Sequence, residues 1–315
     1  MSDHYHDFSK LSGDTLLTDG GLETTLVYHE GIDLPHFAAF PLVDSAEGRA
    51  ALRRYYRSYL ALAAEGGLGF VLDTPTWRAN ADWAPRLGYH LPGLRRVNMQ
   101  SVAILSELRA EWESRVHPLL IDGVIGPRGD GYKGGSMEAE EAEAYHAFQV
   151  EAFAAAGADL VSAITMTTVG EAVGIARAAR AHGLPHVISF TVETDGKLIG
   201  GATLREAIER TEEATGGSPL WYMVNCAHPT HFGEVLEQGE PWTARLGGVR
   251  ANASHRSHAE LDEATELDAG DLEDLGQRYR RLREAVPGLR VLGGCCGTDH
   301  RHVAAIRDAC LTPTH

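Results

Sequence analysis

The sequence contains no apolar run close to the roughly 20 residues that a membrane-spanning helix requires. Its first residues, Met1 to Lys10, are polar and include histidines, with none of the apolar core of a signal peptide. These absences argue against a membrane protein and against export. We therefore predict a cytoplasmic protein.

Basic residues are scarce relative to acidic ones. The chain has 28 Lys and Arg against 44 Asp and Glu, a formal net charge of −16 at pH 7. A surface of this sign repels phosphate backbones, so nucleic acid is excluded as the expected partner. The acidic residues are scattered through segments that read as helices, which indicates a solvated surface and says little about the reaction.

The common nucleotide-binding and hydrolytic motifs are also missing. The first predicted strand is followed by Asp19-Gly20-Gly21-Leu22-Glu23 rather than G-x-G-x-x-G. The glycine-rich segment 126–132 lacks the Lys-Ser/Thr pair of a phosphate loop. We find no carboxylate pair or Ser-His-Asp arrangement, although Glu23 and Asp73 occupy loop positions open to a catalytic role. Both nucleotide-binding interpretations are weak.

What the chain does contain is a regular alternation of two kinds of segment. Eight short apolar, β-branched runs predict strands: Leu16–Thr18, Phe70–Leu72, Leu119–Ile121, Leu160–Ile164, His186–Phe190, Tyr222–Val224, Arg245–Val249 and Arg290–Leu292. Between them, apolar residues recur every three or four positions and predict amphipathic helices, for example Ala46–Ala64, Arg95–Glu111, Ala139–Ala156, Glu171–His182 and Leu204–Thr215.

This alternation predicts parallel strands joined by right-handed helical crossovers. Eight repeats in 315 residues fit a closed (β/α)8 TIM barrel better than an open doubly wound sheet. No linker divides the chain, so we predict one domain over residues 1–315, with residues 1–12 as a flexible N-terminal segment. In such a barrel the active site is built by the loops that follow the carboxyl ends of the strands.

Cysteine is rare, but three of the four cysteines follow predicted strands. Cys226 comes after the sixth strand and Cys295 and Cys296 after the eighth, whereas Cys310 lies in the last predicted helix. Clustered cysteines in a reducing compartment indicate a metal or catalytic site more than a disulfide. Three thiolates on Zn²⁺ leave the fourth tetrahedral position open, as catalytic zinc sites do. Cys310 alone is expected to be a small buried apolar residue.

Two further details bear on this site. Gly293, Gly294 and Gly297 flank the adjacent cysteines, and we expect them to let the backbone turn tightly enough for both thiols to reach one metal. Six histidines follow the sixth, seventh and eighth predicted strands, so a histidine as fourth ligand stays open: His228, His231, His255, His258, His300 and His302.

Three segments together resemble the homocysteine S-methyltransferase family. They are Thr18-Asp19-Gly20-Gly21, Val224-Asn225-Cys226-Ala227-His228-Pro229 and Gly293-Gly294-Cys295-Cys296-Gly297-Thr298, and weaker similarity covers nearly the whole chain. The resemblance implies a zinc-dependent (β/α)8 barrel with Cys226, Cys295 and Cys296 as zinc ligands. It also implies that Asp19 lies near the acceptor amino acid and Asn225 beside the metal, and we add Gly20 and Thr165 to the predicted substrate contacts.

The chain departs from the family where the acceptor binds. Ile164 stands at the position of a family glutamate that contacts the amino group of homocysteine, and Thr165 at the following threonine. Losing that charge-assisted hydrogen bond corresponds to roughly ten- to a hundredfold in affinity. The segments 73–80 and 251–254 also differ from the family pattern, and Arg78 and Arg128 are expected to add positive charge near the rim.

The combined evidence predicts a zinc-dependent S-methyltransferase. Its expected partners are small molecules: a thiol acceptor, homocysteine by default, and a sulfonium or quaternary ammonium methyl donor. Trp77, Trp83 and Tyr132 are candidates to stabilise such a cation. Three alternatives stay open: the same chemistry on another thiol, a zinc-binding barrel without turnover, and a zinc hydrolase, which three thiolate ligands disfavour.

Overall fold

The eight predicted strands close into one parallel barrel. The structure is a computed structural model that describes residues 8–11, 14–132, 135, 137–264 and 266–311. Each strand pairs in parallel with its sequence neighbours, and β1 closes the barrel against β8. The strands are β1 (Leu16–Leu17), β2 (Gly69–Asp73), β3 (Leu119–Ile125), β4 (Leu160–Met166), β5 (His186–Phe190), β6 (Tyr222–Asn225), β7 (Leu246–Ala251) and β8 (Val291–Gly294). The predicted TIM barrel is confirmed.

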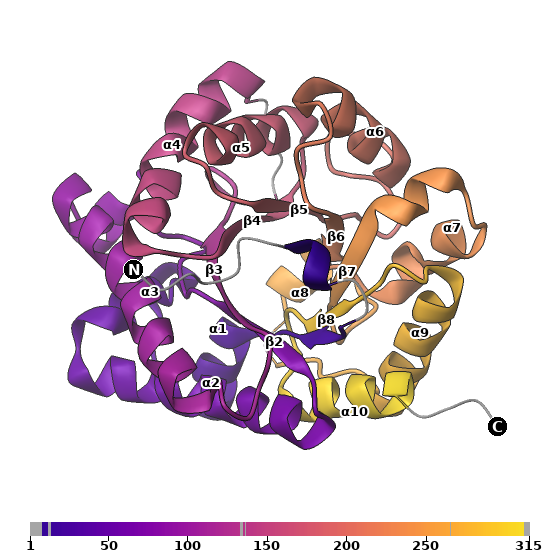
Figure 1. Ribbon diagram of the computed structural model, residues 1–315, viewed down its shortest axis with the longest axis horizontal. Helices are drawn as coiled ribbons and strands as arrows, with labels where there is room; N and C mark the ends of the chain where they lie inside the picture. The colour runs from indigo at the N-terminus through magenta and orange to yellow at the C-terminus, as the bar shows by residue number, and fades with distance from the viewer. Residues whose placement is uncertain (1–7, 12–13, 133–134, 136, 265, 312–315) are drawn as a thin grey trace.

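Helices lie around the strands: the long ones form an outer ring, whereas the short α8 is at the centre of the view in Figure 1. They are α1 (Leu22–Thr24), α2 (Ala46–Gly66), α3 (Leu91–Trp112), α4 (Ala139–Ala156), α5 (Val169–Ala181), α6 (Leu204–Thr215), α7 (Gly233–Glu237), α8 (His258–Asp262), α9 (Leu272–Ala285) and α10 (His300–Leu311). The bounds of α4 and α6 are those predicted. Helix α5 begins two residues earlier than expected because the Thr168 hydroxyl caps it by accepting from the Glu171 amide.

The amino-terminal end of the barrel is filled with apolar side chains. These residues point inward from successive strands and form one buried layer: Leu16, Val71, Leu120, Leu160, Val187, Met223 and Val291. A 3₁₀ helix at Phe8–Leu11 lies over this layer, in front of the barrel in Figure 1, and Leu11 is buried in it. Within the predicted flexible segment 1–12, Phe8 and Leu11 therefore pack against the barrel; residues 1–7 and 12 lie outside the described residues.

The barrel interior becomes polar toward the carboxyl ends of the strands. Because side chains two residues apart share a face of a strand, the next inward positions carry a buried polar layer. Its members are Asp73, Asp122, Ser162, Ser189, Asn225 and Arg250. Polar groups in a core require partners, so this layer places a hydrogen-bonded network directly below the predicted site.

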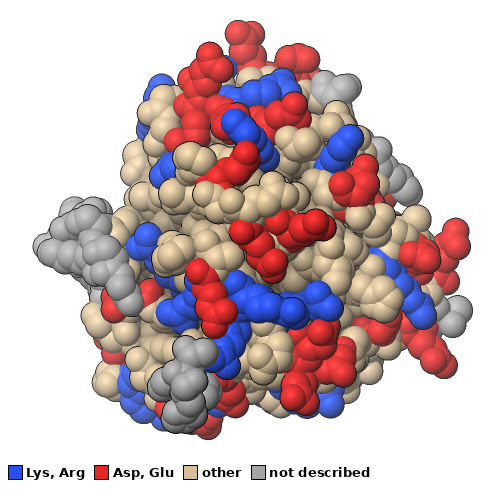
Figure 2. All heavy atoms as spheres, turned by 90° about the vertical axis from the view of Figure 1, so that its right-hand side faces the viewer, with Lys and Arg blue, Asp and Glu red and all other residues tan. Residues whose placement is uncertain are grey.

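The acidic excess is spread over the surface. Figure 2 shows acidic side chains in several groups on one side of the molecule, with basic side chains between them. On α9, Arg278 pairs with Asp274 and Arg280 with Glu284, one helical turn apart. No helix among the described residues is long and apolar enough to cross a membrane.

Candidate metal centre

The structure brings the three predicted cysteines together at the carboxyl end of the barrel. The sulfur atoms of Cys226, Cys295 and Cys296 all lie within 4.8 Å of one another. Within the described part of the chain, no histidine or carboxylate joins this group. Cys310 is elsewhere, on α10, partly buried against the main core as expected.

The donor set fits zinc once it is reduced. Three cysteine sulfurs are gathered in one place, and thiolates are ligands that zinc prefers. In the structure Cys226 and Cys295 are joined as a disulfide, in which Cys296 takes no part. Reduction of that disulfide therefore supplies the three thiolates that a catalytic zinc site uses.

Gly293 and Gly294, which precede the cysteine pair, permit close packing rather than an unusual backbone conformation. A Cβ at Gly293 would lie 1.9 Å from Thr18 Oγ1, and one at Gly294 would lie 2.0 Å from Thr298 Oγ1. Of the three glycines predicted to permit a tight turn, Gly297 has a positive φ of 78°. The other two let β8 pack closely against the loops that follow β1 and β8.

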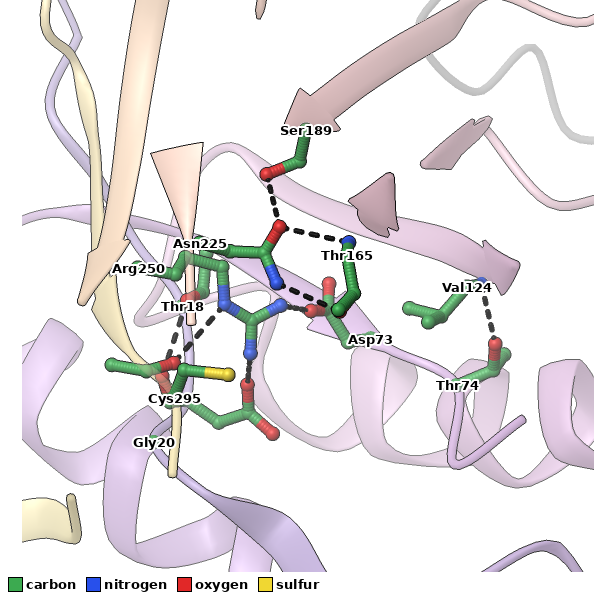
Figure 3. A network of polar contacts seen from close by, with 12 residues as sticks. Thr18, Gly20, Asp73, Thr74, Val124, Thr165, Ser189, Asn225, Arg250 and Cys295 are labelled. Atoms are coloured by element: carbon green, nitrogen blue, oxygen red, sulfur yellow. Dashed lines mark hydrogen bonds and ion pairs between the residues drawn. The ribbon is translucent and has the colours of Figure 1, made fainter. Parts of the chain in front are cut away.

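Backbone strain is concentrated at two residues of the site. Thr165 and Cys226 have φ values of 62° and 52°, a region that non-glycine residues rarely adopt. Asn225 holds both in place (Figure 3): its Oδ1 accepts from the Thr165 amide (2.9 Å) and from Ser189 Oγ (2.7 Å). Its Nδ2 donates to Thr165 Oγ1 (2.9 Å).

The Cys226 carbonyl is held by three side chains that the sequence did not single out for this role. It accepts from Asn252 Nδ2 (3.1 Å), Thr191 Oγ1 (3.3 Å) and His258 Nε2. The other ring nitrogen of His258 contacts Glu193 (2.8 Å). His258, one of the histidines considered as a fourth ligand, therefore orients the backbone of the cysteine instead of joining the sulfur cluster.

A buried arginine crosses the barrel beneath the cysteines. Arg250, on β7, forms an ion pair with Asp73 at the end of β2 (Figure 3) and another with Asp19 after β1. Its Nε donates to the Gly294 carbonyl (3.3 Å), and Tyr55 donates to the other oxygen of Asp19 (3.0 Å). Burial raises the pKa of the Asp19 carboxyl, while the Arg250 guanidinium acts in the opposite direction.

The sequence analysis missed Arg250 and proposed Arg78 and Arg128 instead. Arg78 does line the cavity and lies over the rings of Trp77 and Trp83, 4.9 and 4.1 Å from their centroids. Arg128 is not on the cavity wall and pairs with Asp82 and Glu141 outside it. One signal in the sequence could have found Arg250. It lies in an otherwise apolar strand, two residues after a glycine that faces the barrel interior, so its own side chain also faces inward.

A cavity of about 440 Å³ opens above the cysteines. All four predicted substrate contacts line it, as do Ile164 and five aromatic residues: Asp19, Gly20, Thr165 and Asn225, with Tyr28, Phe37, Tyr56, Trp77 and Tyr132. Trp83, the third predicted aromatic contact, does not; its indole donates to the Gly129 carbonyl (2.8 Å). Burial raises the pKa of Glu23, also on the wall, to about 7.

Comparison with known proteins identifies the family of the chain. The family model described as homocysteine S-methyltransferase matches residues 16–310. The chain belongs to the homocysteine S-methyltransferase family. Its relatives include homocysteine S-methyltransferase 2 of Arabidopsis thaliana, 23% identical over 95% of this chain and 94% of that protein. Another is the selenocysteine Se-methyltransferase of Brassica oleracea var. italica, 24% identical over 94% and 89%.

A solved homocysteine methyltransferase shares the fold. The metallated form of MmuM from Escherichia coli superimposes with a TM-score of 0.75 at 22% sequence identity, covering 96% of this chain and 98% of that one. The likeness extends over the whole barrel of this family member. In this chain, the aliphatic Ile164 and the buried Arg250 are both part of the cavity wall.

Proposed function

We propose that this family member transfers a methyl group from a sulfonium or quaternary ammonium donor to a thiol held at zinc by Cys226, Cys295 and Cys296. The observation that carries the proposal is the cluster of three sulfurs within 4.8 Å on the wall of one cavity. Relatives named for methyl transfer to homocysteine and to selenocysteine support the same chemistry.

The bound metal supplies one thing, an acceptor sulfur kept as a thiolate at neutral pH, the form in which sulfur is nucleophilic. The chain does the rest. Asn225 and Thr165 fix the backbone at Cys226, and the strand ends surround the position left open for the acceptor. Asp19, Gly20, Thr165 and Asn225 are proposed to contact the acceptor, with homocysteine as the default.

The reaction forms one bond and breaks one. A lone pair of the acceptor sulfur forms the new S–CH₃ bond while the bond between the methyl carbon and the donor cation breaks. The electron pair of the broken bond stays on the donor, which leaves neutral, and the thiol proton has already passed to solvent. No general base is needed at the moment of transfer. Trp77 and Tyr132 line the cavity, and their aromatic rings are proposed to stabilise a cationic donor there.

The thiolate ligands require a reducing environment, which supports a cytoplasmic location for the reaction. Small molecules are the proposed partners.

Methyl transfer and zinc content test the proposal together. The reduced, zinc-loaded protein is incubated with homocysteine or 4-mercaptobutanoate as the acceptor and with S-methylmethionine or glycine betaine as the donor, and methylated thiol is measured by mass spectrometry. We expect product with at least one donor–acceptor pair, at least a hundredfold less with Cys226→Ser, and unchanged product with Cys310→Ser as matched control. One zinc per chain without product from any thiol would instead support a binding protein.

A further inference from the structure

The wall of the cavity next to the cysteines already carries a cation supplied by the protein. The Arg250 guanidinium lies between the carboxylates of Asp19 and Asp73 and is itself on the cavity wall. All three side chains are more than nine-tenths buried. A buried charge needs a compensating partner, so these three groups satisfy one another from β1, β2 and β7.

These ion pairs determine whether the carboxylates at the strand ends can balance the charge of a substrate cation. Asp19 accepts from Arg250 on one oxygen and from Tyr55 on the other, and Asp73 accepts from Arg250. The remaining acidic residues on the wall come from α1 and from loops rather than from strand ends: Glu23, Asp130, Glu266 and Asp268.

The end of β4 adds no carboxylate to the cavity wall. Ile164, near the end of β4, lines the cavity beside Thr165, and an aliphatic side chain neither accepts a hydrogen bond nor balances an ammonium group. A substrate ammonium group at this depth would lose its hydration without gaining an unpaired carboxylate at the strand ends. Thiols that lack such a group avoid this penalty.

We propose that Arg250 occupies the place of a substrate cation, so that the acceptor of this enzyme is a thiol without an ammonium group. The assignment concerns the acceptor of the methyl transfer proposed above and rests on that proposed function. It names a class, amine-free thiols, and excludes amino-acid thiols such as homocysteine as the preferred acceptor.

Two pairs of thiols that differ by a single amino group test the assignment. 4-Mercaptobutanoate is homocysteine without its amino group, and propane-1-thiol is 3-aminopropane-1-thiol without its own. Each is titrated by calorimetry into the reduced, zinc-loaded protein at pH 7, a readout that does not depend on the methyl donor. We expect the amine-free member of each pair to bind about ten- to a hundredfold more tightly.

Two variants test whether Arg250 and Ile164 cause the preference for amine-free thiols. Arg250→Met leaves Asp19 and Asp73 without their cation, and the preference should invert in favour of the amine-bearing thiols. Ile164→Glu keeps the buried ion pairs and adds a carboxylate to the wall, so it should strengthen homocysteine binding even if the first variant fails to fold. Arg205→Met, which removes a half-exposed arginine on α6, should keep the wild-type preference.

The outcomes separate this inference from the proposed function. Tighter binding of homocysteine than of 4-mercaptobutanoate by the wild-type protein overturns the inference and leaves methyl transfer standing. An unchanged preference in folded Arg250→Met, or no gain for homocysteine in Ile164→Glu, overturns the role given to the arginine. Failure of every thiol to bind, with zinc present, overturns the proposed function and the inference with it.

Discussion

Asn225 and Thr165 hold each other by two hydrogen bonds of 2.9 Å across the ends of β6 and β4. One bond is accepted from the Thr165 amide and the other is donated to its hydroxyl, so both polar ends of the Asn225 side chain are used. The residue after Asn225 is the candidate ligand Cys226, and both Cys226 and Thr165 have positive φ values. The amide side chain thus couples two strained positions of the site.

Replacing Asn225 should therefore lower the affinity for zinc, even though its side chain is not a proposed ligand. For Asn225→Ala we expect zinc affinity to fall by roughly ten- to a hundredfold, because the backbone that aims Cys226 loses its support. Unsatisfied groups at Thr165 and Ser189 should also lower the free energy of unfolding by about 1–3 kcal/mol. Chelator competition measures the first effect and urea denaturation the second.

Asn98→Ala is the matched control. Asn98 is also fully buried, but it donates to the carbonyls of Ala79 and Leu94 away from the cysteines. It should lower stability and leave zinc affinity unchanged. Equal zinc affinities for the two variants would show that Asn225 has no special role at the metal.

Adding a methyl group at Gly294 should also disturb the metal site, because it crowds the loop that follows β8. In Gly294→Ala the new Cβ would meet Thr298 Oγ1 at 2.0 Å, and the Thr298 hydroxyl also donates to the Cys295 carbonyl (2.7 Å). We expect about 1–3 kcal/mol of destabilisation and weaker zinc binding. Gly93→Ala in α3 meets nothing closer than 3.5 Å and should be neutral or stabilising, as thermal denaturation would reveal.

The titration of Glu23 predicts a pH dependence for donor binding. Burial raises the pKa of this carboxyl to about 7, so it is mostly neutral at pH 6 and mostly ionised at pH 8. A cationic donor in the same cavity favours the ionised form, and its affinity should therefore rise through this window by about fivefold. Calorimetric titration of the donor at several pH values measures the profile.

Glu23→Gln separates this effect from titration of the thiols. The variant keeps the size and polarity of the side chain but has no charge to gain, so its donor affinity should stay flat between pH 6 and 8. A rise that persists unchanged in the glutamine variant would assign the pH dependence to another group.

Metal removal should destabilise the reduced protein. A ligand that binds the folded state at a thousand times its Kd adds about 4 kcal/mol to the free energy of unfolding. We expect a chelator to lower the Tm of the reduced wild type and to have little effect on Cys296→Ser. Cys310→Ser should respond as the wild type does. A wild-type Tm that changes with neither added zinc nor chelator would argue against a metal centre.

Much of the architecture follows from local pattern. Strand and helix periods are properties of neighbouring residues, so the eight strands and the bounds of α4 and α6 were predictable. The position of Cys226, Cys295 and Cys296 at one mouth also followed, because the carboxyl ends of parallel strands in a closed barrel meet at one end. The residue types and their positions along the chain were sufficient to predict that three cysteine sulfurs gather at one place.

The wall of the cavity was decided only by the tertiary structure. Arg250 is 231 residues from Asp19 and 177 from Asp73 along the chain, and no local pattern relates them. Their contact exists because inward side chains of β7, β1 and β2 meet inside one closed barrel. The crowding at Gly294 and the support of Cys226 by Asn252 arise in the same way. The sequence by itself determined where the sulfurs gather, whereas barrel closure determined which charges lie beneath them.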